Sequence, residues 1–274
     1  MNFQTNDNHH WVFEKNLGHG KYAYTYKYSL DGKPVTVKVS RVSERQRDYD
    51  SFRIEVDILK KLSAGRVVSQ VPKYQYSREM FSNDRLFNQL THSRSTSSHI
   101  FSGLLAYDYV PGETLNKIIE SNDISFKPNF DLLANLLEQM LSIITEIHSL
   151  KIYHRDIKPA NIMYTPETGE FTLLDFGLSC LGDNFRGLSG SPAFILPKLL
   201  IGDIPLSEAA TRASDYYALG VTAYEYANSR KPFKLREKDG KFKYSNFAGW
   251  LNLEDAPEWL KEKIKKLIFQ SELL

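Results

Sequence analysis

A long run of apolar residues at helical spacing lies near the middle of the chain, over residues 130–150. Almost every turn of the helix that this spacing predicts has an apolar side chain: Leu133, Leu136, Leu137, Met140, Ile143, Ile144 and Ile147. A helix that is apolar on most sides is normally buried on most sides. We therefore predict a long central helix in the core of the second half of the chain.

The first part of the chain predicts strands and one helix. Loose alternation over residues 11–17 predicts a strand, and a turn at 31–34 separates it from a β-branched strand over 35–39. Residues 51–62 place most of their apolar side chains on one side of a helix. Another apolar strand ends at Pro111-Gly112, where we expect a break in the fold.

Two polar segments have a less definite pattern. Residues 77–99 are rich in Ser and Thr, and we favour a long disordered loop there over an interaction segment. The tail, residues 256–274, includes WLKEKIKKLIF, a basic amphipathic helix. Such a helix can bind a membrane surface or a partner, but we favour packing of its apolar stripe on the rest of the chain.

Composition and charge narrow the class of protein. The chain has 274 residues and is 42% hydrophobic, enough for one large domain or two small lobes. A net charge of +2 gives no sign of a nucleic-acid binder. The single cysteine, Cys180, excludes an internal disulfide framework and favours the cytoplasm or another reducing compartment. We expect no signal peptide and no membrane span, because no stretch approaches roughly 20 apolar residues.

Chemically useful side chains concentrate in residues 153–177, YHRDIKPANIMYTPETGEFTLLDFG. Asp156 follows His154-Arg155, Asn161 comes shortly after, and Asp175 opens Asp-Phe-Gly. A carboxylate can take the proton of a hydroxyl group, and carboxylate and amide oxygens suit the hard cation Mg²⁺. A β-hairpin with incidental acids could contain Asp-Phe-Gly alone, but both motifs in this order are far more specific.

The two motifs, H-R-D-x-x-x-x-N and D-F-G, resemble the catalytic loop and the metal-binding loop of eukaryotic-type protein kinases. The resemblance extends from about residue 11 to residue 269. It implies an α+β, bilobal fold that forms one catalytic domain. Residues 1–109 would form a small β-rich N-lobe with one helix and the polar insert 77–99. Residues 110–274 would form a larger, mainly helical C-lobe, with ATP between the lobes.

The resemblance also implies a role for each motif residue. Asp156 would be the base that orients the substrate hydroxyl, and Lys158 would lie near the γ-phosphate. Asn161 and Asp175 would bind Mg²⁺. A lysine at position 158 is typical of serine/threonine kinases, whereas tyrosine kinases usually have Ala-Arg in this part of the loop.

A lysine and a glutamate from the first part of the chain would complete the catalytic set. Lys38 lies on the β-branched strand and would contact the α- and β-phosphates. Glu55, on the following helix, would form an ion pair with Lys38 in the active state. Asp57 and Glu44 are alternatives to Glu55, and an exposed Lys38 on an edge strand is the structural alternative.

Residues 18–25, GHGKYAYT, resemble the glycine-rich loop of the family, with Ala23 in place of the third glycine. A plain hairpin turn would explain the glycines as well. The resemblance implies that these residues surround ATP: Leu17, Gly18, Gly20, Thr25, Thr36, Lys38, Tyr107, Asp108, Val110 and Met163. Tyr107 would be the gatekeeper, and Asp108 and Val110 would present backbone groups to adenine.

The later motifs match the family less completely. Gly190-Ser191-Pro192 resembles G-T-P, and Ser191 would hydrogen-bond toward Asp156 and Lys158. Lys198 replaces the glutamate of A-P-E, and the family's final helix has no counterpart in this sequence, which favours a compact variant over a truncated chain. Residues 214–221 resemble the start of a helix whose aspartate holds the catalytic-loop backbone. We expect Asp215 to take that role, and Ser214 or Asp215 to cap the helix.

The resemblance therefore implies transfer of the γ-phosphate of Mg²⁺-ATP to Ser or Thr of protein substrates, with a protein activator or scaffold as a further partner. We favour constitutive activity over activation by loop phosphorylation. A pseudokinase acting as a scaffold, a small-molecule phosphotransferase and a structural module without nucleotide remain alternatives. Compact kinases of this kind occur among viral proteins and bacterial effectors, for which a host cell would be the compartment.

Overall fold

The computed structural model describes residues 3–4, 8–19, 23–40, 46–65, 70–81, 101–121, 128–185, 187–229, 235–238, 241–244 and 256–269. The chain divides into two compact units, one of Met1–Arg66 and Pro72–Val110 and one of Val67–Val71 and Pro111–Leu274. This differs from a single boundary after residue 109. Gln70 belongs to the second unit because its carbonyl oxygen accepts a hydrogen bond of 3.1 Å from the Leu173 amide.

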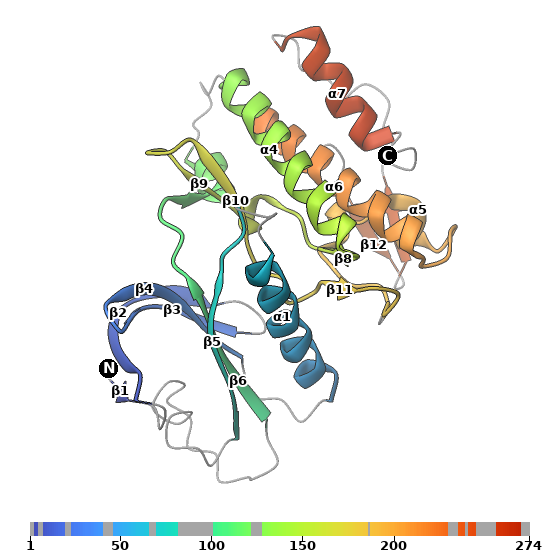
Figure 1. Ribbon diagram of the computed structural model, residues 1–274. Helices are drawn as coiled ribbons and strands as arrows, with labels where there is room; N and C mark the ends of the chain where they lie inside the picture. Colours follow the sequence, from blue (N-terminus) through green and yellow to red (C-terminus); the bar gives the residue numbers. More distant parts are fainter. Residues whose placement is uncertain are drawn as a thin grey trace. The chain divides into compact units, whose positions relative to one another are not determined.

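The first unit is an antiparallel sheet with one helix, α1 (Gln46–Ala64) (Figure 1). Its six strands lie in the order β1-β2-β3-β4-β6-β5. They are β1 (Phe3–Gln4), β2 (His10–His19), β3 (Ala23–Leu30), β4 (Lys33–Ser40), β5 (Tyr74–Phe81) and β6 (Phe101–Asp108). The strands expected over 11–17 and 35–39 and the helix expected over 51–62 are confirmed. Apolar side chains of β2, β3, β4, β5 and β6 form the core, with Trp11, Val37, Met80 and Leu104 fully buried.

The expected polar loop begins later than residue 77. Residues 77–81 belong to β5, which pairs with β6 from Tyr74↔Tyr107 to Phe81↔Phe101. Met80 has no exposed surface, so packing against the sheet extends the strand into a sequence that is polar on average. The remainder of the expected loop, 82–99, lies outside the described residues.

The second unit is mainly helical and has small sheets. Its helices are α3 (Leu115–Glu120), α4 (Phe130–Ser149), α5 (Pro197–Ile201), α6 (Glu208–Asn228) and α7 (Glu258–Phe269). Its strands are β7 (Glu113–Thr114), β8 (Ile152–Tyr153), β9 (Ile162–Thr165), β10 (Glu170–Leu173), β11 (Cys180–Leu181), β12 (Leu235–Lys238) and β13 (Lys241–Tyr244). All seven apolar residues predicted to lie in the central helix are buried in α4. No helix in the described ranges has the length and apolar content that a membrane crossing requires.

Helix α6 begins earlier than the sequence suggested. Ser207 is the N-cap, and its side chain accepts a hydrogen bond from the Ala210 amide. Ser214 and Asp215, which we expected at the cap, are buried inside the helix. The prediction was wrong because the alanine-rich residues before Ser214 are themselves good helix formers and extend the helix toward the N-terminus.

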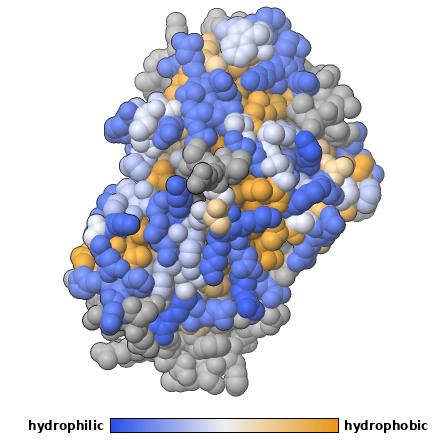
Figure 2. Space-filling view, viewed as in Figure 1, coloured by the Kyte–Doolittle hydropathy of each residue, from blue (hydrophilic) through white to orange (hydrophobic). Residues whose placement is uncertain are grey.

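Helix α7 packs on α6 through its apolar stripe, as expected. Leu260, Ile264, Leu267 and Ile268 are buried, whereas Trp259 and Phe269 are 56% and 50% exposed. A Cβ atom at Gly220 of α6 would lie 2.8 Å from side-chain atoms of Leu267 and Ile268. The glycine therefore allows the two helices to approach closely. On the face drawn in Figure 2, hydrophilic residues predominate and hydrophobic residues form separate patches.

Candidate active site

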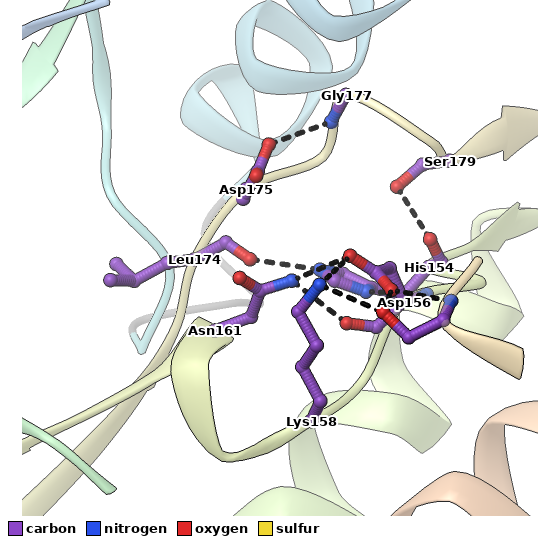
Figure 3. A network of polar contacts seen from close by, with 9 residues as sticks. His154, Asp156, Lys158, Asn161, Leu174, Asp175, Gly177 and Ser179 are labelled. Carbon is purple, nitrogen blue, oxygen red and sulfur yellow. Dashed lines mark hydrogen bonds and ion pairs between the residues drawn. The ribbon is translucent and has the colours of Figure 1, made fainter. Parts of the chain in front are cut away.

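The loop between β8 and β9 brings together two expected catalytic residues, Asp156 and Lys158, and one expected Mg²⁺ ligand, Asn161 (Figure 3). The Lys158 ammonium donates a hydrogen bond of 2.7 Å to Oδ2 of Asp156. The Asn161 amide nitrogen donates to the same oxygen at 3.0 Å and to the Asp156 carbonyl oxygen at 2.8 Å. Pro159 opens a 3₁₀ turn over Pro159–Asn161 that curls the chain back, which allows Asn161 to reach Asp156. Asp156 is only 6% exposed.

Ser191 holds the other oxygen of the same carboxylate. Its backbone amide and its hydroxyl donate to Oδ1 of Asp156 at 3.0 and 2.9 Å. Lys158 donates to the Ser191 hydroxyl oxygen at 3.0 Å. The expected contacts of Ser191 with Asp156 and Lys158 are therefore confirmed. These bonds fix the direction of the Asp156 carboxylate, and they make it an acceptor on both oxygens.

Asp215 of α6 holds the backbone of the same loop. Its carboxylate accepts hydrogen bonds from the amides of His154 at 2.9 Å and Arg155 at 2.7 Å. It also lies 2.9 Å from Nε2 of His148. Burial by itself would raise the pKa of Asp215, but the bonds and positive charge supplied by these donors outweigh it and lower the pKa. The expected backbone role of Asp215 is confirmed.

His148 is a site residue that the sequence did not reveal. It lies one turn after Ile144 on the buried face of α4, and its side chain is 2% exposed. A buried polar residue on an apolar helix face usually has a hydrogen-bond partner. That signal could have predicted a partner for His148, although not that the partner would be Asp215.

Asp175 is attached to the catalytic loop through its neighbour. The Leu174 amide donates to the Asn161 carbonyl at 2.8 Å, and the Leu174 carbonyl lies 3.0 Å from Nε2 of His154. Asp175 itself has a φ of 63° and accepts a hydrogen bond of 3.2 Å from the Gly177 amide. A non-glycine residue in this left-handed region is strained, and such strain often occurs at functional sites. In Figure 3 the Asp175 carboxylate points toward Gly177, and Asp156, Lys158 and Asn161 form a separate cluster.

The chemistry of Asn161 and Asp175 fits Mg²⁺. The nitrogen of the Asn161 amide makes both of its hydrogen bonds to Asp156, so the amide oxygen is the atom suited to a cation. Mg²⁺ usually takes one or two protein oxygens and completes its shell with phosphate and water. The described part of the chain has no group of three or more His, Cys, Asp or Glu side chains that could hold a metal ion.

The expected ion pair of the first unit is present. Lys38 of β4 donates to both carboxylate oxygens of Glu55 in α1, at 2.8 and 2.9 Å. Glu55 is 4% exposed, and a charge this deeply buried normally requires such a partner. Of the two alternatives to Glu55, Asp57 is exposed on α1, and Glu44 lies outside the described residues.

Except for Gly20 and Val110, the residues expected around ATP lie on four strands of the first unit and one strand of the second. Leu17 and Gly18 are at the end of β2, where Gly18 has a φ of 138°; Gly20 lies outside the described residues. Thr25 and Lys38 are paired across β3 and β4, and Thr36 and Tyr107 across β4 and β6. The amide of Asp108 donates to the Lys73 carbonyl, and Val110 ends the unit. Met163 is half-buried in β9 of the second unit, opposite Thr114.

The segment after Asp175 is attached to β8 by strand pairing and to the catalytic loop by Arg155. Cys180 and Leu181 pair with Tyr153 and Ile152, and the Arg155 guanidinium donates to the Gly187 carbonyl. Burial raises the pKa of the Cys180 thiol to about 11, which fits the expected packing role. Lys198, at the position of the missing glutamate, is exposed.

Known proteins match this chain along most of its length. The family model described as protein kinase domain matches residues 11–270. Maternal embryonic leucine zipper kinase of Danio rerio is 27% identical over 258 residues, which are 89% of this chain and 33% of the relative. Calcium-dependent protein kinase 1 of Oryza sativa subsp. japonica is 24% identical over 275 residues, 95% and 47% of the two chains. Serine/threonine-protein kinase PEPKR2 of Arabidopsis thaliana is 35% identical over 112 residues, which are 40% of this chain and 22% of the relative.

The chain spans less than half of the length of each of these three relatives. The residues that the family model matches include the loop in which Asp156, Lys158 and Asn161 meet. Because the family model matches nearly the whole chain and the fold has the sheet and helices expected of it, this chain belongs to the protein kinase family.

Proposed function

We propose that the chain is an ATP- and Mg²⁺-dependent protein kinase that transfers the γ-phosphate to serine or threonine hydroxyls of protein substrates. The observation that supports this best is the set of hydrogen bonds around Asp156, which combine a buried carboxylate, a lysine and an asparagine. Phosphoryl transfer depends mainly on positioning and on neutralising charge, and these are the groups that it needs.

In the proposed reaction Asp156 orients the hydroxyl group of the substrate and accepts its proton. Ser191 and Lys158 keep the carboxylate pointed in one direction, so little reorganisation is needed when the substrate arrives. Lys158 then lies near the phosphoryl group and offsets the negative charge that develops on it. Mg²⁺, when bound by Asn161 and Asp175, supplies further neutralisation of the phosphate oxygens.

Lys38 holds the α- and β-phosphates in the same proposal, and Glu55 keeps the lysine side chain extended along one direction. The backbone groups of Asp108 and Val110 receive adenine. Serine/threonine specificity is favoured by Lys158 and by its contact with Ser191. It is also favoured by the name of the Arabidopsis relative, a serine/threonine-protein kinase.

A scaffold protein with a kinase fold is the second candidate. Four departures from the family pattern favour it. They are Ala23 in place of the third glycine, Thr25 in place of the valine that follows it, Thr36 in place of the alanine before Lys38, and Lys198 in place of the A-P-E glutamate. These are accessory positions, whereas Lys38, Asp156, Asn161 and Asp175 are all present, so we rank this candidate below the enzyme.

The test is incorporation of labelled γ-phosphate from Mg²⁺-ATP into the protein itself and into a generic basic protein. Wild type is compared with Asp156→Asn, and Asp57→Asn is the matched control because Asp57 is an exposed carboxylate. We expect label with wild type and with Asp57→Asn, a loss of at least about 100-fold with Asp156→Asn, and label on serine or threonine. Equal label with Asp156→Asn, or label only on tyrosine, would contradict the proposal. Absence of label with every variant would favour the scaffold.

A further inference from the structure

Gly103 of β6 contacts both α1, the helix that contains Glu55, and the end of β4, the strand that contains Lys38. We propose that Gly103 is a positioning residue for phosphoryl transfer, because its missing side chain sets the position of α1 and so keeps Glu55 within reach of Lys38. The inference rests on the proposed function for its catalytic consequence. Its structural part concerns only the ion pair and can be tested separately.

On the helix side, the ring of Phe52 occupies the space where a side chain at position 103 would be. A Cβ atom built on Gly103 would lie 2.5 Å from both Cδ2 and Cζ of that ring. Phe52 is only 8% exposed, so the ring has little room to turn away. Phe52 and Glu55 are three residues apart in α1, which makes them neighbours on one face of the helix.

On the strand side, Ser40 attaches the end of β4 to the backbone of the same glycine. The Ser40 hydroxyl accepts a hydrogen bond of 2.6 Å from the Gly103 amide and donates one of 3.3 Å to the Gly103 carbonyl. The neighbouring Ser102 hydroxyl donates to the Ser40 carbonyl at 2.7 Å. Ser40 lies two residues after Lys38, so these bonds fix the part of β4 from which the lysine extends.

Backbone conformation does not explain the glycine. Gly103 is absent from the residues of this chain that have a positive φ, and its place in the β6 ladder is one that any L-residue can adopt. The three atoms nearest to a Cβ at this position all belong to the Phe52 ring, so the ring is the main obstacle to a side chain. An alanine at position 103 would need the ring to move by about 1 Å to reach ordinary contact distance. Because the buried ring has little room to turn, α1 would have to move with it. That movement would stretch the bonds of 2.8 and 2.9 Å between Lys38 and Glu55.

The experiment measures the ion pair directly and activity in parallel. An amine-reactive ester acetylates the folded protein, and mass spectrometry gives the rate at Lys38. Lys33, exposed on the same strand, is the internal control. Glu55→Gln gives the rate for a lysine without its carboxylate partner. Each variant is also tested for its melting temperature, its kcat and its KM for ATP, at a temperature well below melting.

We expect Gly103→Ala to raise the Lys38 rate at least threefold toward the Glu55→Gln value, with Lys33 unchanged, and to lower kcat/KM for ATP about tenfold. Phe52→Leu combined with Gly103→Ala replaces the ring by a smaller side chain. We expect the double variant to return both values to within about twofold of Phe52→Leu alone. A residue needed only for stability would lower the melting temperature without this change at Lys38 and without this rescue.

A Lys38 rate in Gly103→Ala equal to that of wild type would overturn the inference, as would failure of the folded double variant to restore it. If Gly103→Ala does not fold, Ser40→Ala decides, because it removes the bonds from the strand side; unchanged Lys38 acetylation in that variant also overturns the inference. If wild type transfers no phosphate, the proposed function fails, while the Lys38 rates still show whether Gly103 sets the ion pair.

Discussion

Replacement of Asp215 by asparagine tests how the catalytic loop is held. The side chain keeps its size, but it loses its charge and one of its two acceptor atoms. In the native chain one oxygen accepts from the Arg155 amide, and the other accepts from the His154 amide and lies 2.9 Å from His148. In either orientation of the new amide, its nitrogen faces at least one backbone amide that can only donate.

The cost follows from that mismatch. A buried donor without an acceptor costs about 1–3 kcal/mol, and the remaining bonds lose the extra strength that a charged acceptor gives. We therefore expect Asp215→Asn to lower the free energy of unfolding by about 3 kcal/mol at pH 7. For a domain of this size that corresponds to a fall of roughly 6–12 °C in melting temperature. Asp57→Asn, at an exposed position, should change stability by less than about 0.5 kcal/mol.

The pH dependence gives a second check with a definite sign. The pKa of Asp215 is lowered in the folded chain, so the unfolded chain binds its proton more readily. The carboxylate therefore stabilises the fold fully above about pH 4, the usual value in an unfolded chain, and this stabilisation is lost as the pH falls further. Urea unfolding followed by circular dichroism should give a difference between wild type and Asp215→Asn that shrinks below pH 4. A difference under about 1 kcal/mol at pH 7, or one that grows in acid, would refute the reasoning.

Three other predictions concern single residues. Ser191→Ala should lower kcat about tenfold in a phosphate-transfer assay, because it removes the hydroxyl contacts with Asp156 and Lys158. Ser191→Thr keeps a hydroxyl group and should retain most activity, so an equal loss in both variants would point to another cause. Gly220→Val should lower the free energy of unfolding by about 2 kcal/mol in urea, because its side chain would collide with α7, and an unchanged midpoint would mean that α7 moves freely. At pH 8, a thiol-alkylating reagent should modify Cys180 more than about 100-fold more slowly in the folded protein than in the unfolded protein, because burial raises the pKa of the thiol to about 11. Fast labelling of the folded chain would contradict that burial.

Local patterns predicted those features that depend on neighbouring residues. The apolar spacing of residues 130–150 correctly predicted the buried face of α4. The order of the motifs correctly predicted that Asp156 and Asn161 lie close together. The start of α6 was missed because Ser214 and Asp215 resemble a cap, while their polar groups bond to distant parts of the chain. Ser214 accepts from the Leu196 amide, and Asp215 accepts from the catalytic loop.

Features set by contacts between distant segments could not be predicted in this way. The sequence around Gly103 has no motif, and only the position of the Phe52 ring explains why a glycine is there. The extension of β5 through Met80 likewise depends on the surface that the rest of the sheet presents to that strand. Both are matters of shape, which a pattern of polar and apolar residues does not encode.

The assignment of Gln70 to the second unit has a consequence for synthesis on the ribosome. The chain leaves the first unit after Arg66, returns to it at Pro72 and leaves again after Val110. The side-chain amide of Gln70 bonds to Gln139, which is made 69 residues later. At about 5–20 residues per second, Gln70 must wait roughly 3–14 seconds for that partner. A nascent chain can thus complete strands β1 to β6 while Gln70, which precedes β5, still lacks its partner in α4. A chain that stalls after β6 would therefore hold Gln70 without its partner Gln139.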